Sequence, residues 1–155
     1  MRFPIILSAF YLTFLGAHAI VAQAHAAPGC TVEKGDYHCN QAAFVVALKE
    51  ARTVAVESQP FDRATTNSLN SLVRTLGKTE SPAPADLTFV LIRTQAEGIF
   101  YGPSERELAS FLVYSRGPNG AGRKLIWIET FDGEPDMAWP IVVFDIIRQF
   151  KASIQ

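Results

Sequence analysis

The sequence predicts an α/β domain of the α+β kind: a four-stranded mixed sheet with helices packed mainly on one face, in the order α-β-α-β-β-β-α. Three observations lead to this fold class. Apolar residues recur at helical spacing over 139–154, and a strand-helix-strand succession over 53–92 implies a right-handed crossover between parallel strands. Asn119-Gly120, between two strand candidates, is a hairpin signal. A parallel pair followed by hairpins makes a mixed sheet.

Two helices and one strand are expected in the first half of the domain. Asn40 can cap a helix over 41–50, because its side-chain oxygen can accept from the free N–H groups of the first turn. Residues 53–57 form a strand candidate, and residues 78–85, which contain two prolines, read as a loop. A second helix begins near Asp62 and ends at Gly77, and its i, i+3, i+4, i+7 apolar positions are Leu69, Leu72, Val73 and Leu76.

The second half supplies three strands and the last helix. The expected strands cover 87–92, 109–115 and 125–128, with a long loop over 95–107 between the first two. Asp136 is the expected N-cap of the last helix, with Pro140 in or near its first turn. The core-facing stripe of this helix, which Val142 and Phe144 widen, consists of Trp139, Val143, Ile146, Ile147, Phe150 and Ile154.

The first 26 residues have the pattern of a cleaved secretory signal. Arg2 is the only charge among them, an apolar run covers 3–15, and Ala-x-Ala sites follow. A membrane anchor is the alternative, but this run is shorter than the roughly 20 residues of a comfortable span. We therefore expect residues 27–39 to form an N-terminal loop and 40–155 a single domain, periplasmic or secreted and not membrane-spanning after cleavage.

Both cysteines, Cys30 and Cys39, lie in the exported part, where an oxidising compartment favours a disulfide between them. Lipidation of Cys30 is the competing interpretation. Only Gly29 of the preceding residues fits a lipoprotein signal well, whereas Pro28 fits poorly.

Little in the chain suits catalysis, metal binding or nucleic-acid binding. His38 is the only histidine beyond the signal, which disfavours histidine bases and multi-histidine metal sites. Residues 117–124 imitate a phosphate loop but lack its Gly-Lys-Ser/Thr end, and the alternating acids Asp132, Glu134 and Asp136 lack the EF-hand pattern. The 14 basic residues form no run or stripe beside 15 acidic ones. We expect no enzyme activity, no cofactor, no metal and no nucleic-acid partner; a hydrolase with an acidic site is the last hypothesis.

Four aromatic residues form the candidate contact surface, two of them in the expected long loop: Phe100, Tyr101, Trp127 and Trp139. The first hypothesis is an exported, non-enzymatic domain that binds a protein or an envelope component through an apolar sheet face or an edge strand. The alternative is a binder of small molecules or lipids, with a pocket between the sheet and the C-terminal helix. The sequence leaves the oligomeric state open.

Between residues 50 and 151 the chain resembles uncharacterised exported bacterial α/β proteins, and more distantly the N-terminal domain of the periplasmic protein TolB and small envelope lipoproteins. The segments that carry the resemblance are ARTVAV at 51–56, ADLTFVL at 85–91, LIWIET at 125–130, WP at 139–140 and IRQFK at 147–151. These segments are structural and bring no catalytic residue with them. The resemblance implies a non-enzymatic role in the bacterial envelope.

Overall fold

The computed structural model describes residues 28–96, 106–117, 120, 122–134 and 136–155. The expected signal segment and two of the candidate contact residues, Phe100 and Tyr101, lie outside this part of the chain.

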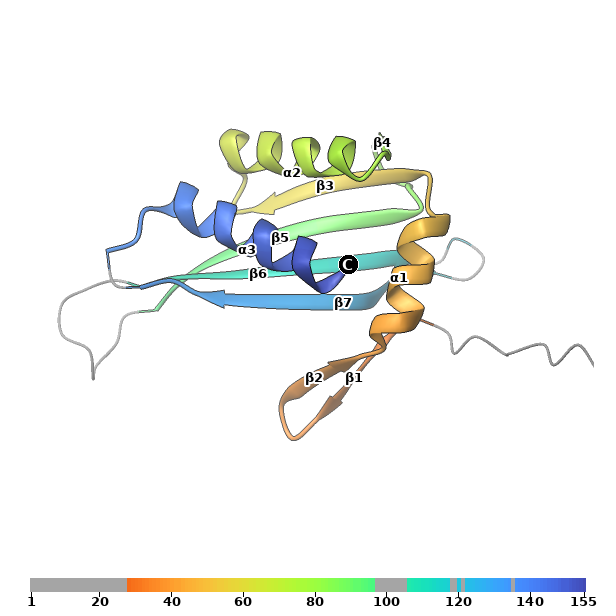
Figure 1. The fold of residues 1–155 in the computed structure, drawn as a ribbon, viewed down its shortest axis with the longest axis horizontal. Coiled ribbons are helices and arrows are strands. Elements are labelled where there is room, and N and C mark those ends of the chain that lie inside the picture. The colour runs from red at the N-terminus through yellow and green to blue at the C-terminus, as the bar shows by residue number, and fades with distance from the viewer. Residues whose placement is uncertain (1–27, 97–105, 118–119, 121, 135) are drawn as a thin grey trace, which may run out of the picture.

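The structure confirms a mixed α/β architecture and adds strands to the expected set (Figure 1). Its elements are β1 (Cys30–Glu33), β2 (Asp36–Cys39), α1 (Gln41–Glu50), β3 (Thr53–Gln59), α2 (Arg63–Thr75), β4 (Thr79–Glu80), β5 (Leu87–Ala96), β6 (Arg106–Arg116), β7 (Arg123–Asp132) and α3 (Trp139–Ser153).

One sheet of five strands, in the order β4-β3-β5-β6-β7, replaces the four strands that were expected. β3 runs parallel to β4 and β5, whereas β5–β6 and β6–β7 are antiparallel pairs, so the predicted combination of parallel and hairpin connections is confirmed. The extra strand, β4, lies in the segment that reads as a loop, and the N–H of Thr79 donates to the carbonyl of Arg52 at 3.0 Å. β6 also begins at Arg106, within the segment expected as a long loop.

The expected N-terminal loop is a two-stranded hairpin, β1–β2, with Cys30 and Cys39 as facing partners joined by a disulfide. Lys34 and Gly35 turn the chain with positive φ angles of 53° and 93°. The hairpin projects beyond the sheet in Figure 1 and contacts its edge strand β7. The predicted disulfide is therefore present, and it closes the base of a projecting element.

All three helices pack on one face of the sheet, where side chains from α1, α2 and α3 enter a single core. Phe150 of α3 lies at its centre, with ring centroids 4.6 Å from Phe111, 5.8 Å from Phe89 and 6.0 Å from Phe44. These tilted and edge-on arrangements are the ones that aromatic rings favour. The space between the sheet and the C-terminal helix is thus filled by aromatic side chains.

The last helix begins two residues later than predicted. Its N-cap is Ala138 and has no side-chain capping bond, whereas Asp136 lies in the preceding turn with a φ of 63°. The prediction of Asp136 as N-cap was wrong, because that residue takes a left-handed turn conformation, not the extended one that an N-cap adopts. Neither α3 nor any other helix within the described ranges is long and apolar enough to cross a membrane.

The other face of the sheet is crossed by an ion pair. Thr88 and Val90 alternate along β5 with the core residues Leu87, Phe89 and Leu91, so they face away from the helices. Arg123 of β7 donates to Glu57 of β3 at 2.6 Å, although two strands lie between them. Its long side chain therefore extends across this face.

Candidate binding groove

A network of polar side chains joins the beginnings of α2 and α3. Asp62 caps α2 by accepting from the backbone N–H of Thr65 at 2.8 Å, and it also accepts from the Thr65 hydroxyl. The Trp139 indole N–H donates to that hydroxyl oxygen at 2.9 Å. The hydroxyl and backbone bonds from Thr65 lower the pKa of Asp62. Thr65 is buried, so its hydroxyl is shared between a carboxylate and an indole and links the two helices.

An arginine completes this junction. The Arg93 guanidinium lies over the Trp139 ring, 5.0 Å from its centroid, and donates to both carboxylate oxygens of Glu107. At the other end of α3, the Gln41 side chain donates to the carbonyl of Ser153 at 2.6 Å. α3 is therefore fixed to α2 at its start and to α1 at its end.

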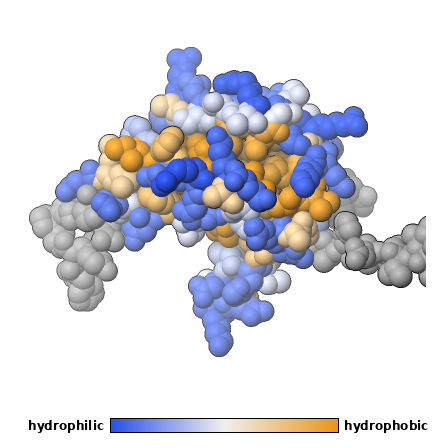
Figure 2. Space-filling view, in the orientation of Figure 1, coloured by the Kyte–Doolittle hydropathy of each residue, from blue (hydrophilic) through white to orange (hydrophobic). Residues whose placement is uncertain are grey.

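A groove of about 480 Å³ lies between the two helices, and we call it the α2–α3 groove. Leu72 and Val143 are buried, so they belong to its floor, while Phe144 stands at its rim with 67% of its surface exposed. Figure 2 shows hydrophobic residues gathered over the helical layer on this side of the molecule. The groove is lined by Ser68, Ser71, Leu72, Pro140, Val143, Phe144, Ile147, Arg148 and Lys151.

Two basic side chains, Arg148 and Lys151, line the groove, whereas Arg63 and Arg74 of α2 do not. Between them α2 and α3 contain one acidic residue. The single acid, Asp145, pairs with Arg148 at 2.9 Å. Lys151, which also lines the groove, forms no ion pair with any described residue. The groove thus combines an apolar floor with an excess of positive charge at its edge.

Two of the predicted contact residues already have partners inside the chain. Trp127 stacks on Phe44 with centroids 4.8 Å apart, and its indole N–H donates to Glu129 at 3.3 Å. Trp139 belongs to the junction described above, and both tryptophans are half-buried. The structure therefore does not bring Trp127 and Trp139 together as one surface, and a partner contact by either stays a prediction.

Sequence reasoning missed the exposed residues Phe144 and Ile141, whose exposed fractions are 67% and 52%. The signal was present in the width of the apolar stripe of α3. Ile141, Phe144 and Ile147 form a line at spacings of three, beside the buried Val142 and Val143. One buried stripe does not require this second line, and two of its members, Phe144 and Ile147, line the groove.

Within the described residues, no group of three histidine, cysteine, aspartate or glutamate side chains is arranged to hold a metal ion. The apolar lining of the groove suits recognition of an apolar group.

Comparisons with known proteins identify no family. No family model matches the chain, and no curated protein matches it. Among solved structures, a PelC variant from Paraburkholderia phytofirmans, described as a dodecamer, matches with a TM-score of 0.43 and 14% identity over 68% of this chain and 90% of that one. A hypothetical protein from Chlamydia trachomatis matches with a TM-score of 0.37 and 12% identity over 67% of this chain and 95% of that one. Likenesses at this level bear neither on the function of the chain nor on its assembly.

Proposed function

We propose that the chain is an exported, non-enzymatic domain of the bacterial envelope or the secreted fraction that binds a protein partner in the α2–α3 groove. The occupant is an amphipathic helix with apolar residues on one side and acidic residues on the other. The observation that carries the proposal is the exposed Phe144 beside an apolar groove that Arg148 and Lys151 also line.

Two independent features of the chain support export. The first 26 residues have the pattern of a secretory signal, and the Cys30–Cys39 disulfide suits an oxidising compartment. The resemblance to exported bacterial envelope proteins points to the same compartment. In that setting the partner is another exported protein or the exposed segment of a membrane protein.

The shape of the groove favours a helix. Along α3 it extends from Pro140 to Lys151, a length of about 16 Å at 1.5 Å per residue, which is about three helical turns. An amphipathic helix can lay its apolar side into such a groove and keep its polar side in water. An acyl chain lying there would leave one side in water, because the groove is open to the surface. This openness favours a protein segment over the alternative of a lipid or small-molecule ligand.

Charge complementarity specifies the polar side of the partner. Lys151 forms no ion pair with a described residue, and α2 contains no acidic residue. Acidic side chains beside the apolar anchors of a partner would meet this charge and be attracted to it, whereas basic side chains would be repelled.

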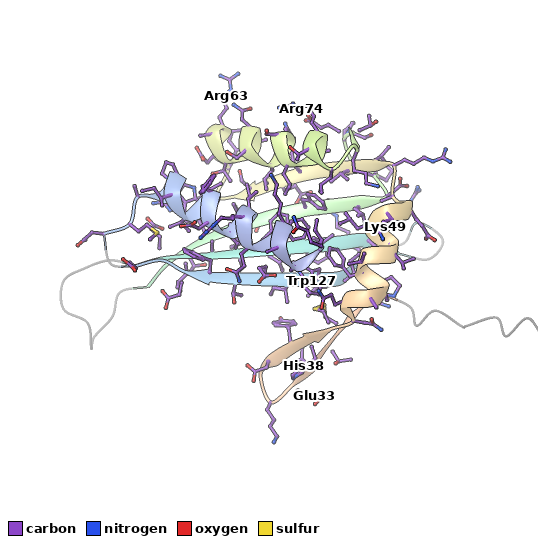
Figure 3. All side chains as sticks on the ribbon, in the orientation of Figure 1. Glu33, His38, Lys49, Arg63, Arg74 and Trp127 are labelled. Carbon is purple, nitrogen blue, oxygen red and sulfur yellow. A yellow bond between two sulfur atoms is a disulfide. The ribbon has the colours of Figure 1, made fainter. Side chains whose placement is uncertain are left out.

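The test is photocrosslinking in the exporting bacterium, with a benzophenone amino acid placed at Phe144 of α3 or at Ser71 of α2, both of which line the groove. The matched controls are Arg63 and Arg74, which lie on the side of α2 away from α3 (Figure 3). Protein adducts of discrete mass that form at the groove positions and not at the controls are expected. Phe144→Ser should weaken binding of the identified partner segment about tenfold or more, as removal of an interface anchor does.

Two outcomes contradict the proposal. Adducts that form equally from groove and control positions would show that the groove has no preferred partner. Adducts with the mass of a phospholipid, and no protein adduct, would establish the lipid-binding alternative instead.

A further inference from the structure

A second, smaller pocket lies on the sheet face opposite the helices, and we call it the arginine pocket. It has a volume of about 220 Å³ and lies where β5 begins and β6 gives way to β7. It is lined by Ala83, Pro84, Ala85, Thr88, Arg116, Gly120, Gly122 and Arg123. Ligand pockets for drug-sized molecules start at about 300 Å³, so this one suits a single small group.

Two arginines from neighbouring strands line the pocket. Arg116 and Arg123 are register partners in the antiparallel β6–β7 pair. Like charges directly opposite each other on a sheet repel and destabilise it. Arg123 is compensated by Glu57, whose hydrogen bond raises the pKa of the arginine. Arg116 forms no ion pair within the described residues, so one of the two positive charges lacks a direct counterion.

The carboxylate of Asp86, which feels the charge of Arg116, already accepts hydrogen bonds from backbone groups. Asp86 accepts from the N–H groups of Thr53 and Arg52, each at 2.9 Å, and these bonds lower its pKa, with a smaller contribution from the positive charge of Arg116. The carboxylate of Asp86 therefore attracts the Arg116 guanidinium electrostatically, but the two side chains form no ion pair. The guanidinium instead lies against the β6–β7 turn, where a Cβ built on Gly120 would lie 3.3 Å from its Nη2 atom.

Thr88 adds a neutral hydroxyl to the pocket. The residue is only 5% exposed, and its hydroxyl forms no hydrogen bond with another described residue. The hydroxyl oxygen is not among the fully buried, unpartnered side-chain atoms of the described residues, so it is accessible and can donate to a ligand atom in the pocket. Gly120 and Gly122, with φ angles of 74° and 72°, line the pocket without side chains that would fill it.

We propose that the arginine pocket binds a phosphate group. A tetrahedral oxyanion can accept from the Arg116 guanidinium on one side and from Arg123 on the other, and it can take a third bond from the Thr88 hydroxyl. Its charge relieves the repulsion between the two arginines. Either a free phosphate compound or the headgroup of an anionic phospholipid supplies this group. The site is independent of the α2–α3 groove, because the two lie on opposite faces of the sheet.

Calorimetric titration of the exported, disulfide-bonded protein with sodium phosphate, against sodium chloride at equal ionic strength, tests the proposal. Saturable phosphate binding is expected, and Arg116→Gln should weaken it by about tenfold or more, since a hydrogen bond to a charged group contributes about that factor. Thr88→Val, which keeps the shape and removes the hydroxyl, should weaken it several-fold. Arg63→Gln and Arg74→Gln, which remove exposed charges from α2, should bind phosphate as the unchanged protein does.

Vesicles distinguish the source of the phosphate. Binding to phosphatidylglycerol vesicles but not phosphatidylcholine vesicles, lost in Arg116→Gln, assigns the pocket to a headgroup, whereas phosphate binding without vesicle binding assigns it to a soluble compound. Absence of saturable phosphate binding, or unchanged affinity in Arg116→Gln, overturns the proposal. If Arg116→Gln does not fold, unchanged affinity in Thr88→Val overturns it. Phe144→Ser should leave phosphate binding intact, so a failure here is distinct from a failure of the groove proposal.

Discussion

Phe144 and Phe150 lie six residues apart in α3 and offer a matched test of which side of the helix is core and which is free. Phe150 is fully buried among three other rings, whereas Phe144 leaves 67% of its surface in water. The same substitution, phenylalanine to alanine, should therefore have different effects on the free energy of unfolding at the two positions.

The structure sets the two magnitudes. Phe150→Ala removes a fully packed ring and leaves a cavity, which costs about 3–5 kcal/mol, or a fall in Tm of about 10–20 °C for a domain of this size. Phe144→Ala loses about a third of the burial of one ring, roughly 0.5–1 kcal/mol. The higher helix propensity of alanine returns about 0.5 kcal/mol of this. The net change at Phe144 should be close to zero.

Urea unfolding followed by circular dichroism measures both values, with the slope of the transition as a check that each variant remains two-state. If Phe144→Ala lowers the free energy of unfolding by more than about 2 kcal/mol, the ring is part of the core and the α2–α3 groove is not a free surface. If Phe150→Ala costs less than about 1 kcal/mol, the ring cluster does not hold α3 on the sheet.

Two further predictions concern single polar groups. Thr65→Val should lower the free energy of unfolding by about 1–2 kcal/mol, because the Trp139 indole N–H loses its acceptor. As a control, Thr75→Val, which changes an exposed threonine of the same helix, should alter the free energy of unfolding by less than about 0.5 kcal/mol. Equal effects of the two substitutions would contradict the role of Thr65 in joining the helices. The pKa of Asp86 is lowered, first by the hydrogen bond from the Thr53 N–H, so the folded protein binds fewer protons there than the unfolded chain. The urea midpoint should fall as the pH drops below the ordinary carboxyl value of 3.8, and Asp86→Asn should flatten this dependence; an unchanged slope would remove Asp86 from the acid sensitivity.

The order of helices and strands could be predicted because each long element carries its own periodic pattern. Strand β4 could not, since its two residues, Thr79 and Glu80, are polar and exposed and owe their conformation to backbone pairing with β3. The start of α3 was misplaced for a related reason. Asp136 is a good capping residue in general, but here the turn around it takes a left-handed conformation, and Trp139 anchors the helix start through Thr65.

The candidate site was less accessible to sequence reasoning. The wide apolar stripe of α3 indicates that more than one side of the helix is apolar. The sequence does not indicate which helix or strand packs on each side. Only the placement of α2 shows that Phe144 lies beside a groove and Phe150 beneath the helix. The arginine pocket depends on strand register in the same way, because Arg116 and Arg123 are seven positions apart in the chain and become neighbours through pairing.

The anchoring of α3 at both ends has a kinetic consequence. Its start is joined to α2 through Trp139 and its end to α1 through Gln41, so a hydrogen bond to a neighbouring helix opposes movement of either end. A partner would bind to a groove that is already formed, so association would proceed in one step. The expected association rate constant is about 10⁵–10⁷ M⁻¹s⁻¹, as is typical of rigid docking. Differences in affinity among partners would then come mainly from differences in their dissociation rate constants.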